Sequence, residues 1–503
     1  MQPGLLSVSP DLSAEAASAS RAIRGGKRFV EVPARHQMTF EARCTEDFVA
    51  PDAPVRLFDE ILEALDFSGF EACYLGGGRP SFPPRLLAKL ILFGQCLGVR
   101  SAREISRRLG RDLYFMWLGH EQQIDHEVLS DFRRSFHSQL KELFKQTVRV
   151  GLQLGLVSLT HVALDGTKIA AQGQRRACSQ ADLEKQLARL DERIEKLLQE
   201  AEAVDAAEDA QYGAARGDEL PADLASAQQR REKLQEALRA LQGSDQERVC
   251  VNDPEAPVQK TQDGKRPGYN GQMAVDAEVG YVVAEEVTTA QNDSEQFVPL
   301  GDQAVGNLGQ EPEVLVADGG YQSGGTLADV AEREWNAYIR QPATDSKGLF
   351  SHDEFTHDET SDTFTCPAGQ PLVFRGLRYL REKPYRRYRA AHICTHCPQR
   401  AQCLSGQARY RELLVSEQEP LLRAMRQKLA TPAGELALQK RKETVERTFG
   451  TIKAVFGLRQ FLLRGLAGAR IEFTLAALAV NLGKLVAWVR AGGSLVRLAA
   501  AAA

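Results

Sequence analysis

The sequence predicts a mixed α/β protein in which a central sheet follows an all-α N-terminal domain and is interrupted by an inserted helical hairpin and a small Cys-rich β-subdomain. Three observations lead to this prediction. Apolar strand-like runs alternate with helical segments in the middle of the chain. A leucine heptad pattern over residues 179–247 breaks that alternation, and four cysteines gather between Cys366 and Cys403. With 503 residues, the chain is long enough for several domains.

The N-terminal part is predicted to be helical after a disordered start. Residues 1–35 are rich in Ser and Ala and are predicted to be a disordered tail, whereas residues 36–150 are predicted to form a helical DNA-binding domain. A Gly-Val-Arg-Ser turn there joins an apolar helix to a short helix, as in a helix-turn-helix, and Arg100, Arg103 and Arg107 would contact phosphates. A small helical bundle with a solvated basic face explains the same pattern equally well.

Charge is unevenly distributed along the chain. The net charge is −4, yet residues 179–247 contain 17 acidic and 9 basic residues, and residues 409–470 contain 13 basic and 6 acidic ones. The acidic segment 179–247 therefore offsets a net positive charge on the rest of the chain, and the overall charge does not exclude a nucleic-acid partner. We expect the insertion to be a structural arm or a dimerisation element.

The sequence predicts a cytoplasmic location without membrane contact. No secretion signal is apparent at the start, and nine cysteines, an odd number, suggest a reducing compartment. The apolar segment 471–489 carries Glu472, Asn481 and Lys484, so we expect a core helix rather than a membrane span.

Two apolar runs in the middle of the chain each lead into an aspartate. ALDG leads to Asp165, and VADGG leads to Asp318. Parallel strands that end in Asp would bring both carboxylates to one edge of the sheet, and oxygen ligands of this kind suit Mg²⁺ or Mn²⁺. The commoner use of Asp-Gly, in a turn or a helix cap, is the alternative for either aspartate alone.

A third carboxylate is expected on the helical tail, in KRKETVERTFGTIKAVFG. Glu446 and Lys453 are spaced two turns apart on one side of that helix, where Glu446 can reach a metal and Lys453 a phosphate. Glu443 is a rival that lies off this line, and a charged surface helix is the alternative if the segment is considered alone. Carboxylates that hold two such ions support phosphodiester cleavage.

The late cysteines have the spacing of a zinc site. Residues 342–410 are predicted to be a Cys-rich β insertion with a C-x27-C-x2-C-x5-C pattern, and a structural Zn²⁺ site is expected there. Either His392 or His396 could replace one thiolate, and four reduced thiols are the alternative. The expected ligands are Cys366, Cys394, Cys397 and Cys403.

Basic and aromatic residues are interleaved in the same insertion, in VFRGLRYLREKPYRRYRAAH. This composition suits phosphate contacts combined with stacking on bases, and we expect Arg378, Arg386 and Arg387 to contact DNA near the carboxylates. A solvated β-hairpin with Arg on its outer edge is the alternative.

Three segments resemble, in order, the Asp, Asp and Glu motifs of DDE transposases from bacterial insertion sequences: ALDGTKIAA, VLVADGGYQS and TVERTFGTIK. The E-x6-K spacing is that of the IS4/IS5-type groups, although Gln439 and Lys442 stand where Tyr and Arg are usual, with Arg441 adjacent. The segments DPEAPVQKTQDGKRPGYNGQMAVD and GRPSFPPRLLAKLILFGQCLGVRSAREI resemble the IS1182-like subgroup most closely.

This resemblance implies an RNase H-like catalytic domain made of residues 158–178, 248–341 and 421–490. It also implies a Mg²⁺ (or Mn²⁺) centre, with Lys453 as a further catalytic residue. Tyr321 and Arg441 are expected to contact DNA beside it. The implied metal ligands are Asp165, Asp318 and Glu446.

The activity implied by the resemblance is cleavage of insertion-sequence ends and their joining to target DNA by two-metal phosphoryl transfer. The expected partners are double-stranded DNA, as terminal inverted repeats and target, and a second copy of the chain, in a bacterial cytoplasm at the nucleoid. Three alternatives stay open: an RNase H-fold nuclease, a non-catalytic DNA-binding protein derived from a transposase, and a zinc-dependent regulator that uses the helix-turn-helix alone.

Overall fold

The computed structural model describes most of the chain beyond residue 43. The described residues are 44–74, 81–173, 177–212, 222–244, 246–261, 264–341, 349–380, 383–391 and 394–502, without the side chains of 201–212, 222 and 383. The tail predicted at residues 1–35 lies outside them. Residues 48–503 form one compact unit, which contains all the elements below except the start of a short helix, η2 (Thr45–Phe48).

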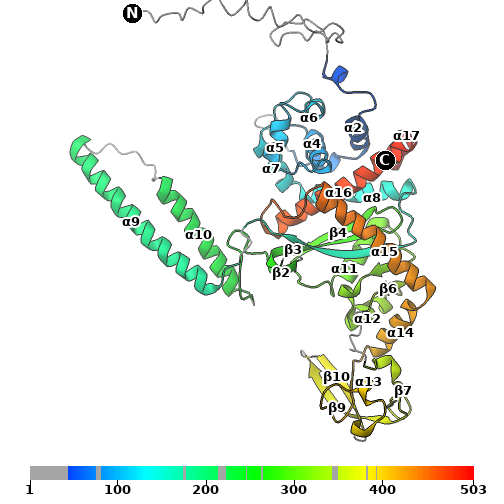
Figure 1. The fold of residues 1–503 in the computed structure, drawn as a ribbon. Helices are drawn as coiled ribbons and strands as arrows, with labels where there is room; N and C mark the ends of the chain where they lie inside the picture. Colours follow the sequence, from blue (N-terminus) through cyan, green and yellow to red (C-terminus); the bar gives the residue numbers. More distant parts are fainter. Residues whose placement is uncertain are drawn as a thin grey trace, which may run out of the picture. The chain divides into compact units, whose positions relative to one another are not determined.

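The N-terminal region is helical (Figure 1). Its helices are α2 (Pro54–Ala64), α3 (Ser68–Glu71), α4 (Pro84–Cys96), α5 (Ala102–Arg108), α6 (Leu113–Leu118), α7 (His126–Ser135) and α8 (His137–Gln153). Helix α4 is buried over almost its whole length, because its apolar residues pack on α2, α6, α7 and the C-terminal helix α16. The turn after α4 needs Gly98, which has φ +73° and whose Cβ would meet the carbonyl oxygen of Val455 at 2.7 Å. Helix α4 is thus a core helix of a bundle.

The centre is a mixed six-stranded sheet with strand order β2-β3-β1-β5-β6, in which β4 also pairs with β3. Strand β1 runs antiparallel to β3 and parallel to β5, and β5 runs parallel to β6. This confirms the predicted mixed α/β class, and the first strands of the sheet pair antiparallel. The strands are β1 (Val162–Ala170), β2 (Val258–Thr261), β3 (Gly264–Asp276), β4 (Val282–Thr288), β5 (Leu315–Ala317) and β6 (Ala337–Ile339).

Helices cover this sheet and close the core. They are α11 (Phe297–Leu308), α12 (Gly324–Glu332), α14 (Glu419–Leu429), α15 (Pro432–Gly450), α16 (Gly465–Arg490) and α17 (Leu495–Ala502). Helix α16 is long and apolar enough to cross a membrane, but 72% of its apolar window is buried against other elements. Its contacts with α8, α4 and β4 explain that burial, as expected for a core helix.

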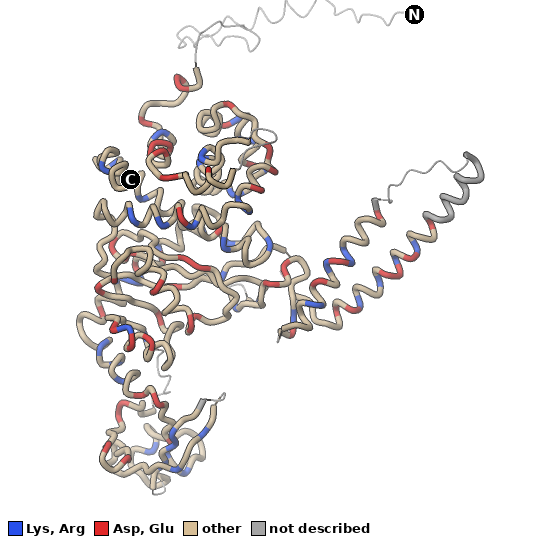
Figure 2. Tube along the Cα trace, turned by 180° about the vertical axis from the view of Figure 1, so that it is seen from behind, with Lys and Arg blue, Asp and Glu red and all other residues tan. Residues whose placement is uncertain are grey.

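A helical hairpin leaves the sheet after β1 and returns before β2. It consists of α9 (Gln180–Tyr212) and α10 (Ala222–Gln242), and acidic and basic residues recur along both helices (Figure 2). Leucines at the predicted heptad positions form its core, and Arg231, at an expected apolar position, donates instead to Asp191 across the hairpin at 2.6 Å. The two ends are joined by an isolated bridge between Cys178 and Val249, with N–H···O distances of 2.8 and 2.9 Å.

A separate five-stranded antiparallel sheet, with its own small core, contains the late cysteines. Its strands are β7 (Thr356–Asp358), β8 (Thr363–Thr365), β9 (Pro371–Leu380), β10 (Lys383–Ala390) and β11 (Glu412–Val415), and it includes α13 (Arg400–Cys403) and the turns η4 (His352–Glu354) and η5 (Cys394–His396).

Candidate active site

Asp165 and Asp318 lie side by side on neighbouring strands. The parallel pairing of β1 and β5 runs from Val162↔Leu315 to Leu164↔Ala317, and the two aspartates follow the last pair. Asp165 does not end its strand as expected, because β1 continues along β3 to Ala170 after β5 has stopped. Asp165 therefore lies at the point of β1 where the pairing with β5 has ended and only the pairing with β3 continues. Asp318 caps a short turn, η3 (Gly319–Tyr321), by accepting from the Gly320 N–H at 2.9 Å.

The surroundings of Asp165 make it hard to ionise. Burial raises its pKa to about 6, and the neighbouring charge of Asp318 acts in the same direction, whereas Arg441 opposes the rise. The Arg441 Nη1 atom lies 2.9 Å from Asp165 Oδ2, and the Gly166 N–H donates to Asp165 Oδ1 at 2.8 Å. Arg441 thus serves as a counter-ion for a carboxylate that shares its site with a second one.

Helix α15 packs against β1 and β5 and supplies Arg441, and the turn that follows it carries Lys453; neither adds a third carboxylate to this group. Burial lowers the pKa of Lys453 and Arg459 adds to this, while Asp165 is near enough to oppose it. Glu446 is exposed on α15. The last turn before Phe456 is a π-helix, η6 (Thr451–Val455), so the α-helical phase that would align Lys453 with Glu446 is lost.

Within the described residues, no three His, Cys, Asp or Glu side chains are grouped closely enough to hold a metal. The structure therefore brings together Asp165, Asp318 and Arg441. Lys453 is close enough to Asp165 for the charge of this carboxylate to act on its pKa, and Glu446 is not part of the group.

A carboxylate that the sequence patterns did not indicate, Asp293, lies close to the glycines that follow Asp165 and Asp318. Asn270 Nδ2 and Gln272 Nε2, from β3, each donate to Asp293 Oδ1 at 2.6 Å. A Cβ on Gly166 would lie 2.9 Å from Asp293 Oδ1, and a Cβ on Gly320 would lie 3.2 Å from Asp293 Oδ2. Asp293 therefore crowds both glycines, together with Gln272 Nε2, 2.5 Å from the Gly166 Cβ position, and Asp318 Oδ1, 3.1 Å from that of Gly320.

Lys168 adds a positive charge to this group, with its ammonium 3.6 Å from Asp293 Oδ1. Because Asp293 lies in a loop before α11, only an Asn-Asp-Ser turn marked it in the sequence, and that signal is common to many surface loops.

Tyr321 does not face DNA as expected. Its ring is fully buried, and its hydroxyl donates to Gln272 Oε1. Burial, together with the charges of Asp165, Asp293 and Asp318, raises the pKa of this phenol. Tyr321 therefore fills the interior beneath the carboxylates, and its assignment as a DNA contact is corrected.

Arg100 is also a structural residue rather than a phosphate contact. Its guanidinium is buried, pairs with Glu472, and donates to the carbonyl oxygens of Gly457 at 2.7 Å and Gln460 at 2.8 Å. Arg103 and Arg107 on α5 are exposed, although Arg107 pairs with Glu104 at 2.9 Å. Of the three predicted N-terminal arginines, only these two face solvent.

The basic residues of the Cys-rich sheet differ in whether their guanidinium groups already have partners within the protein. Arg386 pairs with Asp362 and lies over the ring of Phe374, 4.8 Å from its centroid. Arg387 Nη2 donates to the carbonyl of Arg375 at 3.4 Å. Arg378 is exposed on β9, beside Tyr379, whose ring is 64% exposed.

All four predicted zinc ligands line one small, largely apolar cavity, although, like the other described Cys, His, Asp and Glu side chains, they are not grouped closely enough in this structure to hold a metal. Two turns present them: Gly369 N–H donates to the Cys366 carbonyl at 2.8 Å, and Cys397 N–H donates to the Cys394 carbonyl at 3.3 Å. The Gln370 N–H also donates to Cys366 Sγ at 3.3 Å. His396 is exposed and does not line the cavity, and His392 lies outside the described residues. The thiols in the cavity are those of Cys366, Cys394, Cys397 and Cys403.

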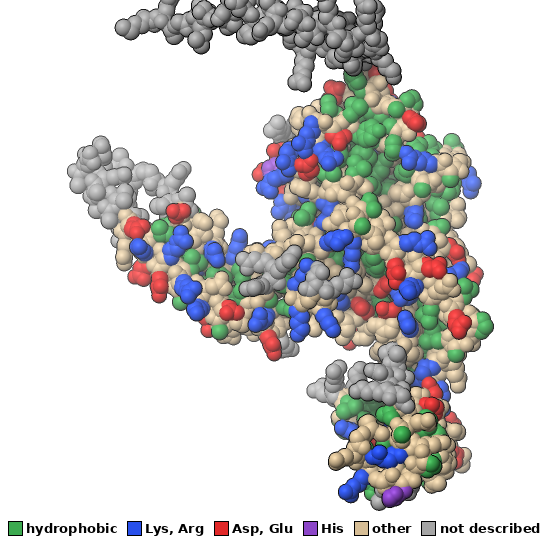
Figure 3. All heavy atoms as spheres, in the orientation of Figure 1, with side chains coloured by type: hydrophobic (Ala, Val, Ile, Leu, Met, Phe, Trp, Pro, Cys, Tyr) green, Lys and Arg blue, Asp and Glu red, His purple; other side chains and the backbone are tan. Residues whose placement is uncertain are grey.

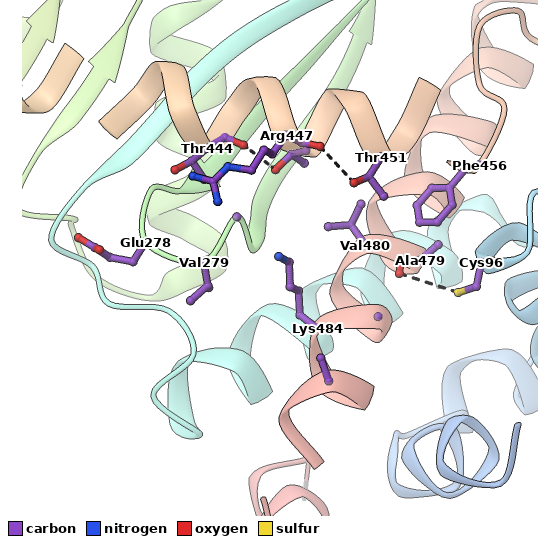
Figure 4. A pocket seen from close by; sticks show the side chains of 14 residues that line it. Cys96, Glu278, Val279, Thr444, Arg447, Thr451, Phe456, Ala479, Val480 and Lys484 are labelled. Carbon is purple, nitrogen blue, oxygen red and sulfur yellow. Dashed lines mark hydrogen bonds between the residues drawn. The ribbon is translucent and has the colours of Figure 1, made fainter. Parts of the chain in front are cut away.

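A different cavity, of about 380 Å³, lies between α15, α16 and the β3–β4 turn (Figure 4). Arg447 and Lys484 both line it, and the pKa of Lys484 is lowered by burial and then by Arg447. None of Asp165, Asp318 and Glu446 is among its lining residues, so it is not the centre described above.

Two segments of the chain match family models of transposases. Residues 43–135 match a model described as Transposase domain (DUF772), and residues 365–486 match one described as Transposase DDE domain. No curated protein gives a significant match. The second segment contains Arg441, Glu446 and Lys453. Over these two segments the chain is therefore similar to transposases, and the second segment is similar to their DDE domain.

Proposed function

We propose that this protein is a transposase of the IS1182-like subgroup, which cuts the ends of an insertion sequence and joins them to target DNA by two-metal DDE phosphoryl transfer. The observation that carries the proposal is the convergence of Asp165 and Asp318 from parallel strands with Arg441 from α15. Lys453, in the turn η6 that follows α15, is near enough for the charge of Asp165 to act on it. Two carboxylates beside two cations suit a phosphodiester and a divalent metal, since both kinds of charge must be bound together.

The residues present fit a hard divalent cation, Mg²⁺ or Mn²⁺, whose preferred ligands are carboxylate oxygens. Asp165 and Asp318 would hold the cation. Glu446, which is exposed on α15, would become the third ligand by a change of side-chain position. When bound, the cations would polarise the scissile phosphate and activate the attacking oxygen. Asp165 must then exchange Arg441 for metal.

The basic residues of the site would orient the DNA. Arg441, released from Asp165, and Lys453, half-buried at the end of α15, would neutralise non-bridging phosphate oxygens as charge develops. Arg103 and Arg107 on α5 and Arg378 on β9 are exposed, and they would contact the duplex outside the centre.

The proposed arrangement uses residues 36–150 for recognition of the terminal repeats and an RNase H-like domain of residues 158–178, 248–341 and 421–490 for chemistry. The hairpin, 179–247, and the Cys-rich sheet, 342–410, are insertions in it. Because two DNA ends must be joined, we propose a homodimer on DNA, in the bacterial cytoplasm.

The test is a cleavage assay on labelled duplex that carries the sequences flanking the gene, with Mg²⁺. Asp318→Asn and Glu446→Gln should each reduce cleavage at least about 100-fold, because they remove ligands rather than supporting contacts. Glu443→Gln, one turn earlier on the same helix, is the control and should leave cleavage unchanged. Binding without cleavage by the wild type under any divalent metal would instead favour a non-catalytic DNA-binding protein.

We also propose a structural Zn²⁺ bound by the four thiols of the Cys-rich sheet. The shared cavity, the two turns that present the thiols and the donation to Cys366 Sγ support the proposal. Wild-type protein purified without chelator should contain about one zinc per chain by elemental analysis. Cys397→Ser should lose it, and Cys73→Ser, at an exposed cysteine of the N-terminal region, should keep it. Equal zinc content in the two variants would refute the site.

A further inference from the structure

Arg100 is a buried cation of the N-terminal helical region. Lys and Arg side chains gather on the surface of this region over α5 and α7, where Arg103 and Arg107 face solvent (Figure 3). Arg100 stands two residues before α5, yet its side chain is only 9% exposed. Its guanidinium has partners 357 to 372 residues further along the chain, in the segment that matches the DDE family model. Arg100 therefore belongs to the packing between the two matched segments rather than to the basic surface.

Two of these partners lie in residues 457–463, which connect η6 to α16 outside every helix and strand. Arg100 Nη1 donates to the Gly457 carbonyl at 2.7 Å, and Nη2 donates to the Gln460 carbonyl at 2.8 Å. The carbonyl of Arg100 in turn accepts from Arg133 Nη1, on α7, at 2.9 Å. A planar guanidinium presents its donors in a fixed fork, so it sets the spacing of the two carbonyl groups.

Glu472, on α16, holds the other end of the same segment. It pairs with Arg100, and its side chain is 4% exposed. Its Oε1 accepts from the N–H groups of Leu462 at 2.6 Å and Leu463 at 2.5 Å. Loss of either charge would leave the other buried without a counter-ion, so the two side chains act as one unit. Together they bond to four backbone groups of this connection.

The same segment closes on the end of β1, the strand that carries Asp165. Gln460 forms a parallel bridge with Ala170. The Phe461 N–H donates to the Ala170 carbonyl at 2.9 Å, and the Ala170 N–H donates to the Arg459 carbonyl at 3.3 Å. The buried ion pair therefore holds residues that bond directly to a strand of the candidate active site.

The segment also supports the turn that carries Lys453. Arg459 Nε donates to the Lys453 carbonyl at 3.2 Å. Burial lowers the pKa of Lys453, and the charge of Arg459 contributes to this shift. Gly98, two residues before Arg100, packs against the same turn, because a Cβ there would lie 2.7 Å from the Val455 carbonyl oxygen. The loop between α4 and α5 thus contacts this turn directly and also through the segment that follows it.

We propose that Arg100 is a positioning residue for DNA cleavage: by holding residues 457–463, it fixes Lys453 beside Asp165. This inference rests on the proposed function, in which Lys453 neutralises the phosphate that is cut. It also makes the N-terminal helical region part of the catalytic unit rather than a detachable DNA-binding module. The inclusion of that region in one compact unit with the sheet supports this.

The experiment reads the surroundings of Lys453 without DNA or metal. The full-length protein is labelled with a trace of acetic anhydride in the folded state, then unfolded and labelled completely with the deuterated reagent. Mass spectrometry gives the isotope ratio of Lys453, which is divided by that of Lys442, an exposed lysine of α15. Arg100→Met should raise this quotient at least about threefold, because the half-buried ammonium is no longer held in place.

Lys89→Met is the matched control, since it removes another buried cation whose partners, Asp59 and Glu63, lie within the helical region. It should leave the quotient unchanged. Arg100→Lys keeps a charge beside Glu472 and should give a smaller rise, because an ammonium does not present the fork that spans both carbonyl groups. This variant replaces Arg100→Met should the latter not fold. An equal rise in Lys89→Met, or no rise in either Arg100 variant, would overturn the proposal.

A second measurement separates positioning from general destabilisation. With Mg²⁺ and a duplex that carries the sequences flanking the gene, Arg100→Met should lower kcat for cleavage at least about tenfold and leave the Kd for DNA within about twofold, because Arg100 bonds to protein rather than to DNA. Arg103→Gln, at an exposed arginine three residues away, should instead raise Kd. A higher Kd with an unchanged kcat in Arg100→Met would overturn the proposal. If the wild type never cuts, the proposed function fails, while the labelling of Lys453 still decides the role of Arg100.

Discussion

Arg441 Nη1 lies 2.9 Å from Asp165 Oδ2, and the two side chains are 12% and 20% exposed. The Arg441 guanidinium is therefore bound to Asp165, the carboxylate that must bind a metal ion in the proposed mechanism. The Arg441 guanidinium stabilises the charge of Asp165 beside Asp318 in the absence of a metal ion. In the proposed mechanism, a metal must therefore displace Arg441 from Asp165 rather than enter an empty site.

Removal of Arg441 should destabilise the metal-free protein. Arg441→Met leaves Asp165 partly buried without its counter-ion, and we expect a loss of about 3 kcal/mol in the free energy of unfolding, measured with urea in EDTA. Added Mg²⁺ should restore part of the loss. The double variant Asp165→Asn/Arg441→Met should recover most of it, since neither charge is then present. Arg447→Met, on the other side of α15, is the matched control, and an equal loss there would contradict this account.

The glycine after Asp165 should not accept a side chain. In Gly166→Ala the new Cβ would lie 2.5 Å from Gln272 Nε2 and 2.9 Å from Asp293 Oδ1. We expect a loss of about 1–3 kcal/mol on urea unfolding, because the contacts are between groups that already hold each other. Gly306→Ala, in α11, where no atom lies within 4 Å of the new Cβ, should be neutral or stabilise by up to about 1 kcal/mol. Similar free energies of unfolding for the two variants would show that a side chain at position 166 does not clash with Gln272 and Asp293.

Asp293 should position the site through its hydrogen bonds. Asp293→Ala removes the acceptor of two amides and should raise the Mg²⁺ concentration needed for half-maximal cleavage, because Asn270 and Gln272 of β3, the strand that pairs with Asp165, are no longer held. Asp293→Asn keeps an oxygen at Oδ1 and should behave closer to the wild type. An Asn variant as impaired as the Ala variant would show that the charge, not the hydrogen bond, is required.

Glu285 should make the fold less stable as pH rises. It is fully buried on β4, accepts from Thr474 Oγ1 at 2.8 Å, and burial raises its pKa to about 8. Between about pH 4.5 and 8 the unfolded chain loses this proton while the folded chain retains it, so stability falls with pH by up to about 1.4 kcal/mol per unit.

Glu285→Gln stays neutral and should lose this dependence. The difference in unfolding free energy between the variant and the wild type should therefore grow from pH 5.5 to pH 8. A constant difference across this range would contradict the raised pKa.

The adjacency of the two aspartates could be predicted from the sequence because it depends on short-range patterns. Each follows an apolar strand, and neighbouring parallel strands bring equivalent positions together. The hairpin was predictable for a similar reason, since a heptad pattern repeats over many residues and its leucines do pack together.

Other parts of the site depend on contacts between distant segments. Arg100 pairs with Glu472, 372 residues away, and no local pattern distinguishes it from the exposed Arg103. Tyr321 follows Asp318 closely but turns inward, because a buried amide, Gln272, accepts its hydroxyl. The π-helical turn at the end of α15 also changes the direction of Lys453 without a sequence signal.

The bridge between Cys178 and Val249 closes the base of the hairpin, so the hairpin can be replaced without a change in the sheet. Both ends of an excursion of some seventy residues start from two adjacent backbone positions, so the sheet experiences only a short antiparallel closure. Lengthening such an excursion costs little, about 0.6 kcal/mol for each doubling of a flexible connection. Evolution, or an engineer, can therefore exchange the arm for a shorter turn or another domain without moving Asp165.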